Sequence, residues 1–182
     1  MTLAYLVTEG KSDADILNKL LPERYLKNTQ LVVGGSKYSA QSLAGTILAV
    51  KSLPVALVID ADTDNESVIQ EKSELVHQLL YQASPGIPFK VFTAVPELEA
   101  VFCYQQSVLE RILKTSIDEL TWQVARQHPK AFLTKNLGQE PLLIESILSN
   151  LDDEMMQLLQ QHPLIQELTE FLDSVAYSEV LA

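Results

Sequence analysis

The sequence predicts an α/β fold: about four mainly parallel strands with helices on both faces of the sheet, followed by an all-helical C-terminal part. Short apolar runs alternate with amphipathic stretches over residues 1–97. Such alternation produces right-handed βαβ units, which build a parallel sheet covered by helices on both faces. After residue 97 the alternation stops, and no later run has the pattern of a strand.

Four runs carry the strand pattern. The third, VALVI at 55–59, is nearly all apolar without alternation, which is typical of a strand that is covered on both faces. The fourth, FKVFTAV at 89–95, alternates more, so we expect it nearer an edge of the sheet. The first two predicted strands are AYLVT at 4–8 and TQLVV at 29–33.

Helical periodicity fills the connections between these strands. Ser12 is predicted to cap the first helix, with Asp15 three residues later as a short version of the capping box. Pro22 follows the end of that helix's apolar face. Two longer helices are predicted at 39–53 and at 66–83.

The last part of the chain is predicted to be a string of helices. Gln-His-Pro occurs twice, at 127–129 and 161–163, but two copies are too few to indicate a repeat architecture. We predict one α/β domain over residues 1–105 and a helical C-terminal extension over 106–182 that packs on it. The helices are expected to be interrupted at Pro129, Pro141 and Pro163.

Composition limits the classes of function. The chain has 182 residues and a formal net charge of −11, which argues against a broad basic face that coats nucleic acid. An enzyme that holds metal ions between carboxylates remains compatible, because the metals supply local positive charge. The single Cys103, the lack of a signal-peptide pattern and the lack of a membrane-length apolar run predict a cytoplasmic protein.

Gly10-Lys11-Ser12 has the form of the end of a phosphate-binding P-loop. The full motif needs another glycine five residues before Gly10, and Tyr5 stands there. A tyrosine lacks the conformational freedom that a phosphate-wrapping loop requires. The P-loop interpretation is therefore rejected, and Glu9, which precedes the motif, needs another explanation.

Acidic residues follow three of the four predicted strands. In an open parallel sheet, ligands bind outside the carboxyl ends of the strands, so side chains that follow strands are expected at one rim. Seven carboxylates at one rim would repel each other unless cations lie between them, and Mg²⁺ or Mn²⁺ is the natural choice for oxygen ligands. The residues are Glu9, Asp13, Asp60, Asp62, Asp64, Glu97 and Glu99.

Each acidic group also has an ordinary explanation. Glu9 and Asp13 suit the start of a helix, where acids complement the helix dipole. The aspartates after the third strand suit a turn, and Glu97 and Glu99 suit the first turn of the next helix. The joint placement at three strand ends favours a shared site over three separate coincidences.

The stretch DADTDNESVIQE, residues 60–71, fits two other motifs in part. It has acids at positions 1, 3, 5 and 12 of an EF-hand loop, but position 6 is Asn65 instead of glycine, and a strand precedes it. VIDAD is also similar to the nucleophile strand of haloacid-dehalogenase phosphatases. Asp64 stands where that pattern has threonine or valine. Neither motif fits well.

Several residues are candidates for phosphate contact. Lys37 follows the second strand at the same rim, with Gly34 and Gly35 expected to offer backbone N–H groups. Gly10 and Lys11 have the same position after the first strand. For the lysines, a solvated side chain after a turn is the competing explanation. The three histidines receive no ligand role.

The acidic pattern resembles that of the Toprim family. Its features here are Glu9 after the first strand and a D-x-D pair, Asp60 and Asp62, after a later strand. The E-G-x-x-D form from Glu9 to Asp13 is most similar to the Toprim domains of OLD-family nucleases and their stand-alone relatives. The stretch PELE, with Glu99, is similar to a further acidic motif of that branch, and the resemblance covers residues 1–105.

The resemblance implies a Rossmann-like sheet and metal-dependent phosphodiester chemistry on DNA or RNA. Asp13, Asp60 and Asp62 would hold the metal, and Glu9 would be a ligand or the general acid/base. OLD nucleases also use an ATPase domain, so a separate ATPase is an expected partner. The alternative is a non-catalytic Toprim-fold binding module in DNA repair or defence.

Overall fold

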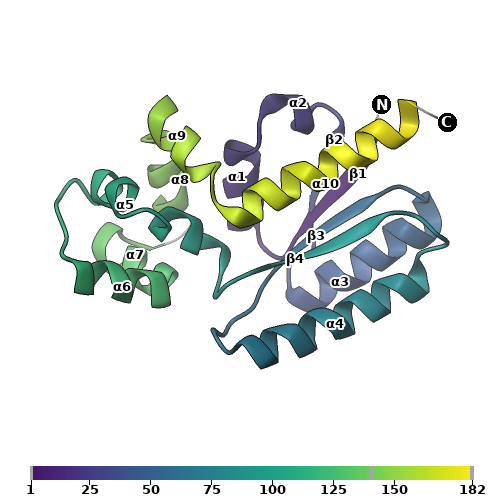
Figure 1. The fold of residues 1–182 in the computed structure, drawn as a ribbon, viewed down its shortest axis with the longest axis horizontal. Coiled ribbons are helices and arrows are strands. Elements are labelled where there is room, and N and C mark those ends of the chain that lie inside the picture. Colours follow the sequence, from purple (N-terminus) through teal and green to yellow (C-terminus); the bar gives the residue numbers. More distant parts are fainter. Residues whose placement is uncertain (1, 140–141, 181–182) are drawn as a thin grey trace.

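The structure is a computed structural model that describes residues 2–139 and 142–180, with side chains up to residue 176. It contains a parallel sheet in the order β2-β1-β3-β4, with helices around it (Figure 1). The predicted α/β class and the helical C-terminal part are confirmed. The strands are β1 (Ala4–Thr8), β2 (Thr29–Val33), β3 (Val55–Asp60) and β4 (Phe89–Ala94).

The strand order creates a switch point in the middle of the sheet. Thr8 at the end of β1 lies opposite Val33 of β2 on one side and Val58 of β3 on the other. The chain therefore leaves β1 toward one edge and later returns to pair with its other side. Ligands in open α/β sheets bind at such a point, outside the carboxyl ends of the strands. Glu9 and Asp60 lie at the ends of the two central strands.

Two apolar cores cover the two faces of the sheet. Successive residues of a strand point to opposite faces, so Leu6 packs in one core and Val7 in the other, and both are fully buried. The first core also contains residues of α1 and α10, and the second contains residues of α3 and α4 (Figure 1). The bounds are α1 (Lys11–Leu20), α3 (Lys37–Thr46), α4 (Glu66–Ala83) and α10 (Pro163–Val180).

Helices make up every regular element that the structure describes after β4. Figure 1 shows α5–α9 grouped beyond the end of the sheet where the strands finish. The core on the α1 side runs without a break from Leu6 in the sheet to Leu133 and Leu143 in these helices. The division at residue 105 stays a prediction. The elements are η2 (Leu98–Cys103), α5 (Gln106–Leu113), α6 (Glu119–Gln127), α7 (Pro129–Leu137), α8 (Leu142–Ser149) and α9 (Asp153–Leu159).

Within the described residues, no helix combines the length and the apolar character that crossing a membrane would require.

The start of α1 differs from the sequence prediction. Its N-cap is Gly10 and not Ser12, and the backbone N–H of Gly10 donates to Asp13 Oδ2 at 2.8 Å. Asp13 therefore makes the contact that was expected of Asp15, which is exposed. A glycine cap has no side-chain signal, which is why a sequence pattern favours the nearby serine.

Two other local features were not predicted. A short helix, α2 (Glu23–Leu26), follows Pro22, and the predicted helix 39–53 is α3 continued by a π-helical turn, η1 (Ile47–Lys51). Ser52, with a φ of 52°, ends that turn in the left-handed region. Of the three prolines expected to interrupt the C-terminal helices, Pro141 lies outside the described residues.

Gly34 at the end of β2 allows an unusually close approach between β2 and α3. A Cβ atom at this position would lie 2.4 Å from Ala40 Cα and 2.5 Å from Ala40 N. Gly34→Ala is therefore expected to destabilise the fold by about 1–3 kcal/mol or more, a fall in melting temperature of roughly 2–12 °C.

Gly45→Ala is the matched control for this substitution in thermal melting. Its Cβ would meet Ala83 Cβ at 3.6 Å, an ordinary contact, and alanine favours a helix over glycine by about 1 kcal/mol. Gly45→Ala should melt at or above the wild-type temperature. Equal melting of Gly34→Ala and wild type would show that the close approach to α3 does not occur in solution.

Candidate functional site

Two carboxylates join the ends of β1, β3 and β4. Glu9 follows β1 directly, and its Oε1 accepts a hydrogen bond from the backbone N–H of Asp60 at 2.9 Å. Asp60 Oδ1 in turn accepts from the backbone N–H of Leu98, which follows β4, also at 2.9 Å. The three strand ends that carry the predicted acids therefore meet at the switch point of the sheet.

Two further carboxylates complete an acidic cluster, which we define as Glu9, Asp13, Asp60 and Glu99. Asp13 points from the first turn of α1 and is 9% exposed, and Glu99 lies on η2 and is 1% exposed. The charges of the other three members all raise the pKa of Asp60. The carboxylates of these four residues, which are far apart in the sequence, are thus close enough in the fold to repel one another.

Burial and mutual repulsion raise the pKa values in this acidic cluster. Burial, followed by the charges of Asp13, Glu99 and Glu9, raises the pKa of Asp60 to about 8. Burial raises the pKa of Glu99 to about 7. Burial also raises the pKa of Glu9, against the opposing effects of the Asp60 N–H and of Lys37. At neutral pH the cluster therefore retains protons unless cations bind beside it.

Glu99 is the least satisfied member of the cluster. Neither of its carboxylate oxygens has a hydrogen-bond partner among the described residues. Lys130 Nζ lies 3.4 Å from Oε1, a distance that allows an ion pair but without the geometry of a hydrogen bond. A buried charge with so little compensation is costly, so this carboxylate needs either a proton or a cation.

Lys37 and Asp62 extend the site toward solvent. Lys37 is the first residue of α3, and its ammonium group forms an ion pair with Asp62 while lying 3.9 Å from Glu9 Oε1. Asp62 adopts a φ of 55°, a left-handed conformation that aspartate tolerates better than most residues. The predicted phosphate-contacting lysine thus lies between two of the predicted metal ligands.

Three of the candidate residues have other surroundings. Glu97 Oε1 accepts from the backbone N–H of Lys130 at 2.7 Å, and so caps the start of α7, although its charge still acts on Glu99. Asp64 is exposed and lines a different pocket, on the other side of the β4–η2 connection. Lys11 is exposed at the start of α1 and lines a surface hollow with residues of α8.

The backbone N–H groups predicted to bind phosphate already have acceptors. Gly34 N–H donates to the carbonyl of Thr8, and Gly35 N–H donates to the carbonyl of Glu9, both at 2.8 Å. Gly10 N–H donates to Asp13, as described above. The local fold therefore already uses these donors, and phosphate contact at the glycines stays a prediction.

A pocket of about 570 Å³ opens beside the cluster, between α3 and α4. Glu9, Lys37, Asp60 and Asp62 line its polar side, and Ile59, Val76 and Leu79 line its apolar side. Its volume is within the usual range for small-molecule sites, about 300–1,000 Å³. The pocket also includes Tyr38 and Lys72, which the sequence analysis missed. An 83% exposed aromatic side chain beside Lys37 is unusual, but a sequence does not show exposure.

The donor set fits a hard divalent cation in chemistry, although the side chains are not arranged as a finished metal site. Among the described residues, no group of three or more His, Cys, Asp or Glu side chains is positioned to hold a metal ion. The acidic cluster nevertheless supplies only carboxylate oxygens, which Mg²⁺ and Mn²⁺ prefer. Glu99, with both oxygens buried and without hydrogen bonds, is the observation that supports the fit.

Without divalent cations, the protein is expected to lose stability as the pH rises from about 4 to about 8. In this interval folded Asp60, with its pKa raised from 3.8 to about 8, holds a proton that the unfolded chain has released. The folded state binds more protons, so stability falls as the pH rises, and this contribution is constant outside the interval.

Melting temperatures in a chelator across this pH interval test the assignment. Asp60→Asn should make the fall of the melting temperature with rising pH shallower. The remaining fall should end near the pKa of Glu99, about 7. Asp15→Asn, at an exposed site on α1, should keep the wild-type slope. An equally steep decline in Asp60→Asn would mean that Asp60 is already ionised in the folded protein at neutral pH.

Comparison with known proteins gives a fold-level likeness only. No family model and no curated protein matches the sequence. The chain is similar to the C-terminal region of the OLD protein of Xanthomonas campestris pv. campestris, phased with iodine, at 14% identity and a TM-score of 0.45 over 98% of both chains. The same region phased with platinum gives 14% identity and a TM-score of 0.43, over 98% of this chain and 96% of the other. These values do not establish a common family or activity.

Proposed function

We propose that this chain carries out metal-dependent phosphodiester chemistry on DNA or RNA, as a Toprim-like nuclease. The observation that supports the proposal most is the acidic cluster at the switch point, with Asp60 half-buried and Glu99 buried, and both incompletely neutralised. Structural carboxylates are normally paired with cations or hydrogen-bond donors, whereas perturbed, under-compensated ones gather at functional sites.

The roles follow from the surroundings of each side chain. Asp13, Asp60 and Glu99, with Asp62 at the rim, would hold Mg²⁺ or Mn²⁺. A bound divalent ion supplies polarisation of a phosphoryl oxygen and stabilisation of the attacking or leaving oxygen. Glu9 Oε1 is fixed by the Asp60 N–H, which leaves Oε2 to accept or return a proton.

Lys37 is the residue of the site best placed to meet the substrate's phosphate. Its side chain is 24% exposed, and its ammonium group lies within reach of both Glu9 and Asp62. Its charge offsets part of the repulsion that a polyanion meets at a rim of carboxylates. A separate ATPase partner stays part of the proposal.

A non-catalytic binding module is the alternative, and the hydrogen bonds of the site favour it in part. Asp13 binds the Gly10 N–H, Glu9 binds the Asp60 N–H, and Glu97 binds the Lys130 N–H. Each of these contacts also stabilises the local fold. The net charge of −11 adds to the argument, because it disfavours a broad basic surface that would hold a nucleic-acid substrate.

An assay on purified protein separates the two functions. Cleavage of single- and double-stranded DNA and RNA is measured with Mg²⁺, with Mn²⁺ and with a chelator. The proposal expects cleavage with either metal and none in the chelator. No cleavage of any substrate with either metal, at protein concentrations that bind nucleic acid, would favour the binding module.

A further inference from the structure

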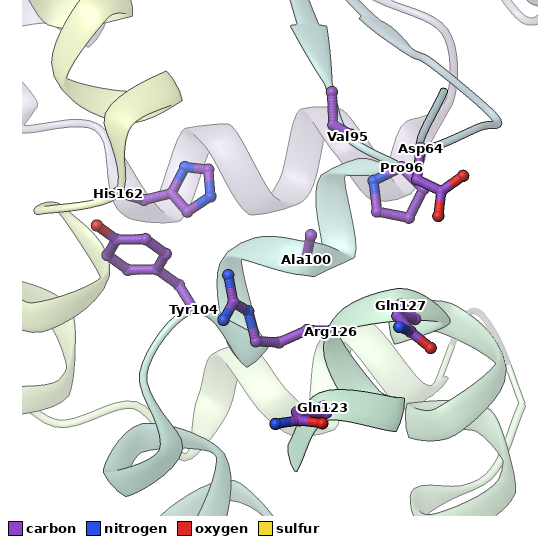
Figure 2. A pocket seen from close by; sticks show the side chains of 9 residues that line it. All are labelled: Asp64, Val95, Pro96, Ala100, Tyr104, Gln123, Arg126, Gln127 and His162. Carbon is purple, nitrogen blue, oxygen red and sulfur yellow. The ribbon is translucent and has the colours of Figure 1, made fainter. Parts of the chain in front are cut away.

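A second pocket lies on the other side of the segment that carries Glu99. It has a volume of about 330 Å³ and lies between the β4–η2 connection, α6 and the turn before α10 (Figure 2). Its chemistry differs from that of the acidic cluster, because its side chains are mainly aromatic, amide and guanidinium groups. The lining includes Pro96, Tyr104, Gln123, Arg126, Gln127 and His162.

The pocket shares backbone with the acidic cluster. The carbonyl of Pro96, in the pocket wall, accepts a hydrogen bond from the backbone N–H of Asp62 at 2.9 Å. Ala100, also in the wall, is the neighbour of Glu99 on η2. The pocket and the acidic cluster therefore lie on either side of one short backbone segment, residues 96–100.

Two rings form one side of the pocket. The ring centroids of Tyr104 and His162 are 4.8 Å apart at an angle of 71°, and Figure 2 shows the two rings next to each other. Burial lowers the pKa of His162, so the imidazole is neutral at physiological pH. Its Nδ1 accepts from the Leu164 N–H at 3.2 Å, which assigns the proton of the neutral ring to Nε2.

The opposite side offers hydrogen-bonding groups. Arg126 packs over the ring of Trp122 at 5.2 Å and, among the described residues, forms no ion pair with a carboxylate. Figure 2 shows its guanidinium pointing across the pocket, toward the side that carries Tyr104 and His162. Gln123 donates through Nε2 to Glu119 at 3.0 Å, which leaves its carbonyl oxygen as an acceptor. Gln127 adds a second amide.

We infer that this pocket accepts one unpaired base of a nucleic-acid strand whose phosphate lies at the acidic cluster. The inference rests on the proposed function for its substrate class. Nucleobases combine a stacking face with an edge of donors and acceptors, which matches rings on one side and amides with a guanidinium on the other. The volume suits a single base and excludes a duplex.

Asp64 at the edge of the pocket supports a base over a phosphate as the occupant. Its carboxylate is exposed and repels a phosphate group, but it accepts a hydrogen bond from an exocyclic amino group. Arg126 is the only Lys or Arg in the described lining, which is too little positive charge to hold a polyanion alone.

Binding of short labelled single strands in a chelator, followed by fluorescence anisotropy, tests the inference without catalysis. Tyr104→Leu removes the stacking ring and should weaken binding by about 5- to 100-fold. Tyr104→Phe keeps the ring and should bind like wild type, which separates stacking from a fold defect. Arg126→Gln should weaken binding, whereas Lys27→Gln, which removes one charge just after α2, should not.

Strands with single abasic sites at successive positions decide whether a base is the group recognised. At one position, removal of the base should weaken binding to wild type as much as Tyr104→Leu weakens binding of the intact strand. The affinity of Tyr104→Leu should not fall further when the base at that position is removed. If Tyr104→Leu weakens binding equally for intact strands and for abasic strands at every position, the inference is overturned, because the pocket would then contact the backbone of the strand. A free mononucleotide binding as tightly as the strand would also overturn it.

The failure of this inference is distinguishable from the failure of the proposed function. Metal-dependent cleavage that is unchanged by Tyr104→Leu and Arg126→Gln, on single and double strands alike, would leave a nuclease without a base pocket. Base-dependent binding in a wild-type protein that cleaves nothing would support the pocket and overturn the nuclease.

Discussion

Replacing Glu9 by glutamine is expected to lower metal-dependent cleavage of nucleic acid by about 10²- to 10⁴-fold, the usual contribution of a general acid/base. The amide oxygen of glutamine can still accept the hydrogen bond from the Asp60 N–H, so the fold should be preserved. What the variant loses is the negative charge and the proton acceptor. The rate is measured at saturating metal on purified protein, with melting temperature as the check on folding.

Asp15→Asn is the matched control for this variant. It neutralises an exposed carboxylate on α1, the helix that also carries Asp13, and should cleave at the wild-type rate. Equal rates for wild type and Glu9→Gln would show either that Glu9 is structural or that the activity comes from a contaminating nuclease. Only a contaminating nuclease predicts that the cleavage activity separates from the protein in a further purification step.

Mg²⁺ or Mn²⁺ is expected to raise the melting temperature by about 5–10 °C at a concentration near one hundred times its dissociation constant. The cation binds the folded state and relieves repulsion among buried carboxylates. Asp60→Asn combined with Asp62→Asn should abolish most of this gain. In a chelator near pH 8, the same double variant should melt above wild type, because one charge with a raised pKa has been removed.

A double variant at exposed acids controls for the loss of two charges. Asp15→Asn with Glu71→Gln changes the net charge equally but leaves the acidic cluster intact, so it should keep the response to metal. If wild type and the Asp60/Asp62 variant respond equally, the cations bind elsewhere on the protein. The proposed metal ligands would then be wrong whatever the cleavage assay shows.

The strands were predictable because their signal is local. β1 and β2 coincide with the predicted runs 4–8 and 29–33, since apolar runs between breakers suit a covered sheet. The position of Glu9 and Asp60 at one rim followed from the same pattern, because parallel strands end on one side. Even the edge position of β4 could be predicted from its alternation.

What depends on distant packing was not predictable. Glu97 caps a helix that begins with Pro129, and the spacing of acids in the sequence does not show that this helix returns to the rim. Tyr104 and His162 form one wall only because the turn before α10 packs against η2. A sequence also does not reveal that the fold already uses the N–H groups of Gly34 and Gly35.

The unbroken apolar core beneath α1 and α10 has a consequence for how this chain can be divided. Leu6 and Phe102 belong to the same cluster as Leu133 and Leu143, and all four are almost completely buried. A fragment that ended near residue 105 would expose apolar side chains on one face of its sheet to solvent. A fragment of the helices alone would lack the sheet residues that complete its core. The α/β part and the helices are therefore expected to fold as one unit, so genetic truncation is a poor way to assign their separate roles.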